Sequence, residues 1–438
     1  MKKLTPQETR ETFLDFMEQK GHLKIRGASI IPQNDPSLLY INAGMAPMKA
    51  YFSGKQRPPQ SDLCNIQPCI RTIDIEDVGD RHHLTFFEML GSWSINNYFK
   101  DRAIDLAYEL LTERFEFPKD KLYVTVFGGD KDKGIPPDED SIKFWQRIGM
   151  PDSHIVVLGE DNFWSGGDTG PCGPCTEIFF DSGAKHGKSY EETGVFDTQN
   201  RYIEIWNAGV FMQYNRREDG TLEKLPFMSV DTGSGLERMV MTLNEKESVY
   251  DTDTFKPYMD FITDKMHITD EAGLASARRI ADHIRAATLI LSEGVIPGKD
   301  GRDYIPRRLI RSSASIAMLR GSPDFSFDAL TKKVIDTMGV AYPKMRLNAN
   351  KIRQVMDMEL QTFERSVRQG VAKFDKITRD TDILTGQQVF DLRSSLGMPL
   401  DLIATLAKER KIKVDMEGYK AEFAKHQMIS RNINGGRK

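Results

Sequence analysis

The segment from Asp231 to Arg238 has residue types that could bind a nucleotide together with an amine. Gly233 and Gly235 are separated by one residue, and glycines so placed let the backbone approach a ligand closely. Arg238 follows on the next expected helix and could reach a polyphosphate with its forked donors. Asp231 could hold a cationic amino group. A tight turn before a helix explains the same spacing without any ligand, so this segment alone leaves both interpretations open.

Two other segments carry similar chemistry. Arg71 precedes a short acidic loop and then the run Arg81–Leu90, which ends in aromatic residues. An arginine, a hairpin loop and an aromatic strand can bind a phosphate, enclose it and stack a purine, although an amphipathic hairpin without a ligand can carry the same residues. The run Asp161–Glu177 is dense in glycine, proline and cysteine and leads into an expected strand. Such a composition is unusual for a loop that has no function.

Together, Arg71 with its loop, Phe87-Glu88 and the downstream Gly233–Arg238 run resemble motifs 2 and 3 of the class II aminoacyl-tRNA synthetases. In several longer blocks, the amino-acid sequence is similar to that of the alanyl-tRNA synthetase family. These are Asn34-Asp35-Pro36, Asn42-Ala43-Gly44-Met45, TFFEMLG (85–91), GDTGPCGPCTE (167–177), EIWN (204–207), VDTGSGLER (230–238) and IADHIRA (280–286). Because the blocks spread over nearly the whole chain, convergence is a poor explanation for them.

The resemblance implies an enzyme that activates L-alanine with ATP and Mg²⁺ and passes it to the acceptor stem of tRNA(Ala). It implies that Arg71 holds the α-phosphate, that Phe87 stacks the adenine, and that Arg238 takes the γ-phosphate and faces the ring from the other side. Arg71 and Arg238 would be the catalytic pair. The remaining ATP-binding residues implied are His83, Trp164, Ile205, Trp206, Asn207 and Gly235. Asp231 would pair with the alanine ammonium, and Asn207 would help to fix the same substrate.

The chain departs from the family's pattern beside this site. The family reads His-His-Thr-Phe-Phe, whereas Leu84 here separates His83 from Thr85, so either the hairpin shifts to keep His83 in place or the contact is lost. After Asn207 the family has one apolar residue before Val-Phe, whereas this chain has Ala208-Gly209. An extra small residue there could enlarge or reshape the alanine pocket.

The RNA-binding residues also depart in part. The resemblance implies that Asp401 and the arginines Arg302, Arg307 and Arg308 bind the tRNA. The family's asparagine that reads a G·U pair falls on Gly301, which has no side chain to offer a base, so we expect weaker G·U preference. The family's editing and C-terminal domains are not in this sequence. Because a small pocket rejects an added hydroxyl only by about a hundredfold, we expect serine to be misactivated unless a separate editing protein corrects it.

The order of elements predicts an α+β fold. A capping box at Thr5 and Glu8 begins a helix that Gly21 should end. Short β-rich runs follow at 122–127, 155–158, 178–180 and 202–206 without a βαβ rhythm, which favours a mainly antiparallel sheet flanked by helices. Beyond that the pattern is helical, for example at 351–377. The pattern places a domain boundary near 245 and a softer one near Gly386. The resemblance implies that 1–245 is a class II catalytic domain and 246–438 a mainly helical tRNA-recognition domain.

Composition restricts the class of protein. The chain has 438 residues, of which 39% are hydrophobic, and we see neither an apolar run of membrane-spanning length nor a signal peptide, so a cytoplasmic protein is expected. Its four cysteines cannot form a disulfide framework. The pairs Cys64/Cys69 and Cys172/Cys175 invite a zinc interpretation, but the second pair belongs to a family loop that needs no metal, so we predict no protein-bound structural metal.

Charge divides the chain. Residues 1–270 carry 30 Lys+Arg and 44 Asp+Glu, whereas residues 271–438 carry 30 and 20. The basic part is a candidate for a polyanionic partner, although solvated helix faces explain the same surplus. Besides tRNA charging, two functions stay open: an adenylate-forming enzyme that delivers its amino acid to an acceptor other than tRNA, and a catalytically inactive paralogue with a binding or regulatory role. Consumption of tRNA distinguishes the first two.

Overall fold

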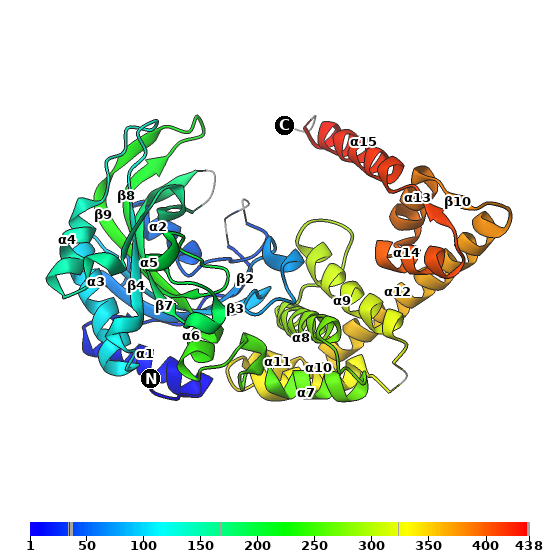
Figure 1. The fold of residues 1–438 in the computed structure, drawn as a ribbon, viewed down its shortest axis with the longest axis horizontal. Coiled ribbons are helices and arrows are strands. Elements are labelled where there is room, and N and C mark those ends of the chain that lie inside the picture. Colours follow the sequence, from blue (N-terminus) through cyan, green and yellow to red (C-terminus); the bar gives the residue numbers. More distant parts are fainter. Residues whose placement is uncertain (34, 36–37, 167–168, 323, 436–438) are drawn as a thin grey trace. The chain divides into compact units, whose positions relative to one another are not determined.

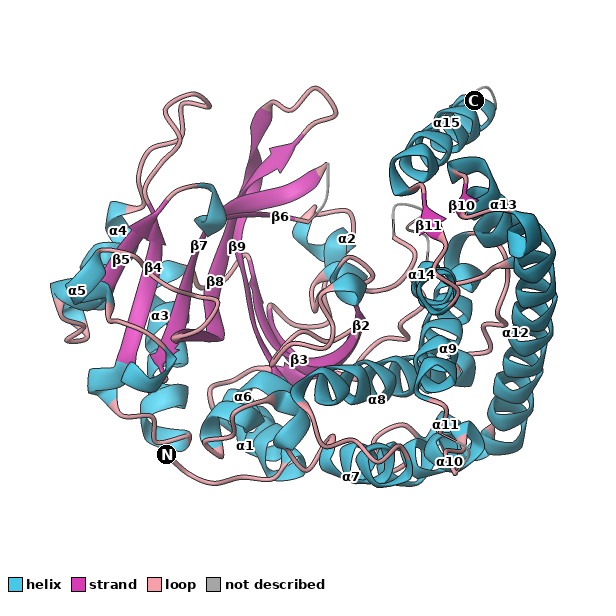
Figure 2. Cartoon of the chain, turned by 45° about the vertical axis from the view of Figure 1, so that its right-hand side comes forward, coloured by secondary structure: helices cyan, strands magenta, loops and turns pink. Residues whose placement is uncertain are grey.

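The computed structural model describes residues 1–33, 35, 38–166, 169–322 and 324–435, and the side chains of 380, 401 and 427–435 are not described. The chain divides into two compact units, Met1–Met259 and Asp260–Lys438. The first unit contains the sheet and the second is mainly helical (Figures 1 and 2). This agrees with the predicted α+β fold class.

Among the described residues of the first unit, nine strands form one mixed, mainly antiparallel sheet in the order β1-β2-β3-β9-β8-β7-β4-β5, with β6 paired to β7. Only β1–β2 and β4–β5 are parallel pairs within that described sheet. The strands are β1 Leu23–Lys24, β2 Asp62–Ile70, β3 Phe86–Ile95, β4 Leu122–Phe127, β5 Ile155–Leu158, β6 Phe163–Ser165, β7 Gly170–Asp181, β8 Tyr202–Arg216 and β9 Leu222–Gly235.

The helices of this unit are α1 Pro6–Gln19, α2 Lys49–Phe52, α3 Lys100–Glu109, α4 Glu139–Arg147, α5 Tyr190–Thr193 and α6 Leu236–Leu243. The capping box predicted for the first helix is confirmed, since the Thr5 side chain accepts from the Glu8 N–H and the Glu8 carboxylate accepts from the Thr5 N–H. Gly21 follows the helix end with φ +96°, a conformation that glycine adopts without strain.

The main core lies between the sheet and α1, α3 and α6. Phe13 and Phe16 of α1, Ile104 of α3 and Met239 of α6 are buried there against strand residues such as Val230. Burial of these apolar side chains stabilises the packing of the helices on the sheet. On the opposite side of the sheet, Trp93 of β3 and Val210 and Met212 of β8 belong to a smaller core with Met45 and Met48. The central strands also line a cavity.

The boundary between the units falls within α7 Lys256–Lys265. The second unit contains α8 Glu271–Ser292, α9 Gly301–Arg320, α10 Phe327–Met338, α11 Pro343–Leu347, α12 Ala349–Ile377, α13 Gly386–Leu396, α14 Leu400–Glu409 and α15 Met416–Gly435, with a parallel pair of short strands, β10 Ile383–Leu384 and β11 Lys413–Val414. The periodic pattern at 351–377 is a helix as predicted. Ile352, Phe363 and Phe374 are buried on it, whereas Met358 is exposed.

Candidate active site

A cavity of about 510 Å³ lies within the first unit. It is bounded by β3, β8 and β9, by the start of α6, and by the loops that precede and follow β2. Most of the residues predicted for the site line it: Arg71, His83, Phe87, Trp164, Asn207, Asp231, Gly235 and Arg238. Strand pairing is what joins these distant segments, because Asp231 lies opposite Trp93 on β3 and Gly233 opposite Asn207 on β8.

One end of the cavity carries a buried carboxylate. Asp231 is 8% exposed, and its Oδ1 accepts a hydrogen bond of 2.7 Å from Trp93 Nε1. Burial raises the pKa of Asp231 to about 7, with the Trp93 hydrogen bond acting in the opposite direction. Nearby, Asn207 Nδ2 donates to Glu177 Oε1 at 3.3 Å, and Asn207 Oδ1 is buried without a hydrogen-bond partner in the described part of the chain. An acceptor pair of this kind suits an ammonium group.

The other end has an aromatic slot between two arginines. The Arg71 guanidinium carbon lies 4.7 Å from the centroid of the Phe87 ring, and Arg71 Nε donates to Asn42 O at 3.2 Å. A Cβ added to Gly235 would lie 4.0 Å from Phe87 Cδ2 and 3.9 Å from Arg238 Cβ. Gly235 therefore leaves open the space beside both side chains, where a flat ring could enter.

Arg238 is paired with an acidic residue that sequence reasoning did not single out. Its Nη1 donates to Glu204 Oε2 at 2.8 Å. Glu177 also lines the cavity, and burial together with the charge of Glu204 raises the pKa of Glu177 well above its usual range. Two carboxyl groups that repel one another suit a divalent cation, because oxygen ligands are what Mg²⁺ prefers. Both glutamates stand inside blocks quoted above, EIWN and GDTGPCGPCTE, but only cross-strand pairing shows that they share a cavity.

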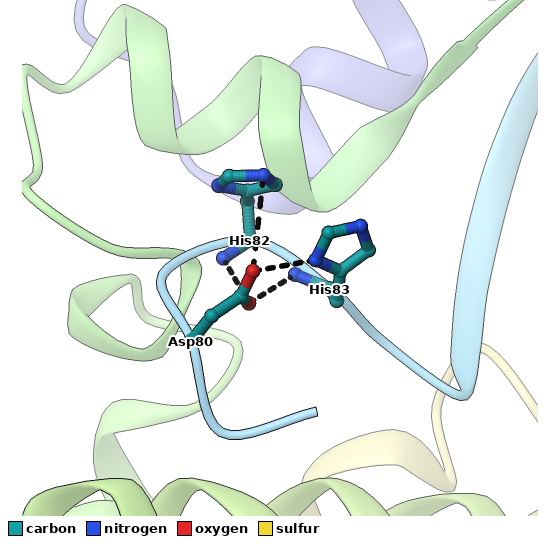
Figure 3. Close-up of side chains that lie close together, drawn as sticks. All are labelled: Asp80, His82 and His83. Carbon is teal, nitrogen blue, oxygen red and sulfur yellow. Dashed lines mark hydrogen bonds and ion pairs between the residues drawn. The ribbon is translucent and has the colours of Figure 1, made fainter. Parts of the chain in front are cut away.

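His83 stays beside the cavity despite the extra Leu84. Asp80 Oδ1 accepts from the N–H groups of His82 and His83 at 3.0 and 2.8 Å, and Asp80 Oδ2 lies 2.5 Å from His83 Nδ1 (Figure 3). These bonds fold the loop so that both histidines line the cavity, and Leu84 is buried. Hydrogen bonding to Asp80 raises the pKa of His83, whereas burial lowers that of His82 to about 4.

In the described part of the chain, Asp80, His82 and His83 are the group spaced closely enough to hold a metal ion. Their polar atoms already bond to one another in shaping the loop, and no ion is assigned to them. The four cysteines do not form such a group among the described residues. Each is a buried free thiol.

Ile205 and Trp206 lie elsewhere than predicted. Each is 1% exposed and packs in the main core, where the Trp206 ring centroid lies 5.7 Å from that of Phe13. Their side chains do not line the cavity. The pairing of β8 with β7 shifts by one residue between Trp206 and Glu204, so a bulge at Ile205 turns its side chain away. Glu204 takes the cavity-facing position instead.

The residues predicted to bind tRNA belong to the second unit. Arg302, Arg307 and Arg308 lie on the first half of α9 and are partly exposed. Arg307 Nε lies 3.7 Å from Glu359 Oε1. Asp401 falls within α14, but its side chain lies outside the described ones. Likewise Asn34, Pro36, Gly167 and Asp168 of the quoted blocks fall outside the described residues.

Comparison with known proteins decides the family. The family described as "tRNA synthetases class II (A)" matches residues 8–438. The chain belongs to the class II tRNA synthetases. Alanine–tRNA ligase of Acetivibrio thermocellus is 39% identical over 98% of this class II chain, and alanine–tRNA ligase of Thermoanaerobacter sp. (strain X514) is 38% identical over 99%. The chain spans about half the length of these relatives, 49% of each.

Among solved structures, an apo histidyl-tRNA synthetase of S. aureus aligns with this class II chain at a TM-score of 0.35 and 12% identity. The alignment covers 55% of this chain and 70% of that one. Within the described residues, no helix is long and apolar enough to cross a membrane.

Proposed function

We propose that the chain condenses L-alanine with ATP to form alanyl-adenylate and pyrophosphate, and then transfers the alanyl group to the acceptor end of tRNA(Ala). The observation that carries this proposal is the convergence, in one cavity, of the buried Asp231 carboxylate with the Arg71–Phe87–Arg238 slot. An amino acid and a nucleotide bound at the two ends would meet between them. The names of the relatives support alanine and tRNA as the substrates.

In the first step Asp231 and Asn207 hold the alanine ammonium, and the alanine carboxylate attacks the α-phosphorus of ATP. The bond from the α-phosphorus to the bridging oxygen breaks, and pyrophosphate leaves. Phe87 and Arg238 hold the adenine between them, beside Gly235, while Arg71 neutralises the charge that grows on the α-phosphate. No nucleophile from the protein is needed, since positioning and charge stabilisation suffice.

Mg²⁺ fits the acidic side of this cavity. Glu177 and Glu204 would hold it there, and once bound it would neutralise charge on the phosphates. Arg238, which pairs with Glu204 in this structure, would bind the γ-phosphate. In the second step a ribose hydroxyl at the RNA end attacks the carbonyl carbon of the adenylate, and AMP leaves. Arg302, Arg307, Arg308 and Asp401 of the second unit are the proposed contacts to the acceptor stem.

Alanine-dependent exchange of pyrophosphate into ATP tests the first step. Arg71→Ala and Arg238→Ala should each slow exchange at least about a hundredfold, since each is asked to stabilise phosphate charge by several kcal/mol. Asp231→Ala should abolish exchange while leaving ATP binding nearly intact. Arg217→Ala is a matched control, because Arg217 pairs with Glu223 on the exposed β8–β9 hairpin. Exchange at the wild-type rate in both cavity arginine variants would contradict the assignment.

Charging of tRNA(Ala) tests the second step. Full-length tRNA(Ala) and a stem with G·C in place of G·U should both accept alanine, the first with a modest preference. Robust exchange without charging of either RNA would show that the amino acid goes to another acceptor. Loss of ATP binding in Asp231→Ala would show that this carboxylate does not hold the substrate's ammonium.

A further inference from the structure

Strand β8 displays its cavity-lining residues at an unusual spacing. Glu204, Asn207 and Val210 all line the cavity, and each is three residues from the next. In a regular strand, residues three apart point to opposite faces. An extra residue between each pair is therefore required if all three side chains are to share one face.

The pairing registers locate the extra residue between Asn207 and Val210. On β9 the partners of these two residues are Gly233 and Asp231, which are two apart. On β7 the partners of Asn207 and Gly209 are Glu177 and Thr176, which are adjacent. Strand β8 thus has one residue more than both of its neighbours at Ala208-Gly209. This bulge coincides with the place where the sequence has one residue more than the family's pattern.

The bulge leaves the side chains on either side of the extra residue on their expected faces. Ala208 is fully buried in the core on the helix side, as the single intervening residue of a regular strand would be. Val210 still faces the cavity directly opposite Asp231. The bulge in the β8 backbone accommodates the extra residue. At Val210 and Phe211, the side chains of β8 again alternate between the cavity and the core as in a regular strand.

The bulge that accommodates the extra residue of β8 depends on Gly209. A Cβ at this position would lie 2.6 Å from Phe211 Cε1, which is closer than Cβ atoms approach other atoms, and 3.1 Å from Phe211 Cζ, which is a tight contact. The Phe211 ring is fully buried and packs edge-on against Phe99, with centroids 5.4 Å apart. It is therefore not free to swing away. A side chain at 209 would have to move either this ring or the strand that carries Val210.

We propose that Gly209 is a positioning residue for amino-acid selectivity, acting through Val210. This rests on the proposed function, in which Asp231 holds the ammonium of the substrate. In an α-amino acid the side chain and the ammonium group are bonded to the same carbon, so the side chain would lie beside Val210, which is paired with Asp231. Val210 limits the room there to a small apolar group, and the bulge keeps Val210 in place only while residue 209 has no side chain.

The test compares pyrophosphate exchange with alanine, glycine and serine across four variants. Gly209→Ala should raise the KM for alanine at least tenfold and reduce the preference for alanine over glycine, with the KM for ATP changed less than twofold. Adding Phe211→Leu to Gly209→Ala should restore most of the alanine KM, because it removes the ring that a Cβ would meet. Phe211→Leu alone and Ala208→Gly serve as controls, and each should leave the alanine KM within threefold of the wild type.

Deletion of Gly209 gives an independent arm. It leaves Ala208 alone between Asn207 and Val210, so a regular strand would place both flanking side chains on the cavity face without a bulge. Alanine activation should stay within about fivefold of the wild type. If Gly209→Ala does not fold, the deletion variant still tests the positioning role of Gly209.

Three results would overturn the inference: an unchanged alanine KM in Gly209→Ala, no rescue by Phe211→Leu, or a folded deletion variant that no longer activates alanine. A melting temperature lowered in Gly209→Ala without any change in the alanine KM would mean that the glycine has a structural role alone. A wild-type chain that exchanges no pyrophosphate with any amino acid would instead overturn the proposed function, and this inference with it.

Discussion

Burial gives the Asp231 carboxyl a pKa of about 7, which lies within the pH range in which pyrophosphate exchange can be assayed. Under the proposed function, only its ionised form attracts the alanine ammonium, which stays charged throughout that range. The kcat/KM for alanine should therefore fall by nearly tenfold per pH unit below about pH 7 and level off above it, because kcat/KM reports the free protein. An exchange profile from pH 6 to 8.5 at low alanine measures this.

Asp231→Asn provides the control for that profile. Its residual exchange should be low and should lose the step near pH 7, because the amide does not ionise. A wild-type profile that is flat down to pH 6 would show that ionisation of Asp231 does not limit alanine binding.

At the residue scale, local sequence patterns located part of the cavity's lining. Arg71, Phe87, Asp231 and Arg238 stand in short runs whose residue types point to a phosphate, a ring and an amine. Glu177 and Glu204 could not be found in this way, because they lie on different strands and meet only through the pairing of β7 with β8. Ile205 and Trp206 were assigned to the ATP-binding site from the resemblance, and a bulge that no periodicity shows places both in the core.

At the scale of elements, sequence predicted the strands well where short β-rich runs are bounded by turn residues. The runs 122–127 and 155–158 are β4 and β5 with the predicted bounds. The long strands β7, β8 and β9 were seen only in part. Two of the bulges between β7 and β8 lie at Gly173-Pro174 and Ala208-Gly209, and glycine and proline by themselves indicate turns. Register, and hence the shape of the cavity, depends on pairings between segments far apart in the chain.

Helix α9 gives a prediction about RNA selectivity. Gly301 begins this helix with φ +57°, and a Cβ added there would meet nothing within 4 Å. Asparagine tolerates this left-handed conformation better than most residues. Gly301→Asn should therefore fold normally and, under the proposed function, increase the preference for a G·U over a G·C stem about tenfold, since one good base contact contributes ~1–3 kcal/mol.

Aminoacylation of the two stems by wild type and Gly301→Asn measures that preference. Gly301→Ala is the matched control, because it has a side chain in the same backbone conformation but no amide. An equal gain in the alanine variant would attribute the effect to the helix start, and no gain in either would show that position 301 does not contact the base pair.

At the scale of the whole molecule, residues 1–270 are acidic and residues 271–438 are basic. Under the proposed function, we therefore expect salt to weaken the tRNA-dependent step and to affect amino-acid activation little. Counterions released from RNA phosphates make binding weaken as salt rises. The KM for tRNA should rise at least about tenfold between 50 and 200 mM salt, whereas alanine-dependent pyrophosphate exchange should change less than twofold. Equal responses of the two assays would argue against an RNA contact through the 30 Lys+Arg of residues 271–438.

The ion pair between Arg238 and Glu204 has a consequence for how tightly a nucleotide can bind. A triphosphate that engages Arg238 must take the guanidinium from an anion that already holds it, so binding is an exchange of partners. The free energy lost with the Arg238–Glu204 pair is therefore subtracted from the free energy of nucleotide binding. Such a site can bind the phosphates through Arg238 during the reaction. It can still release the nucleotide readily, because Glu204 pairs with Arg238 again as the product leaves.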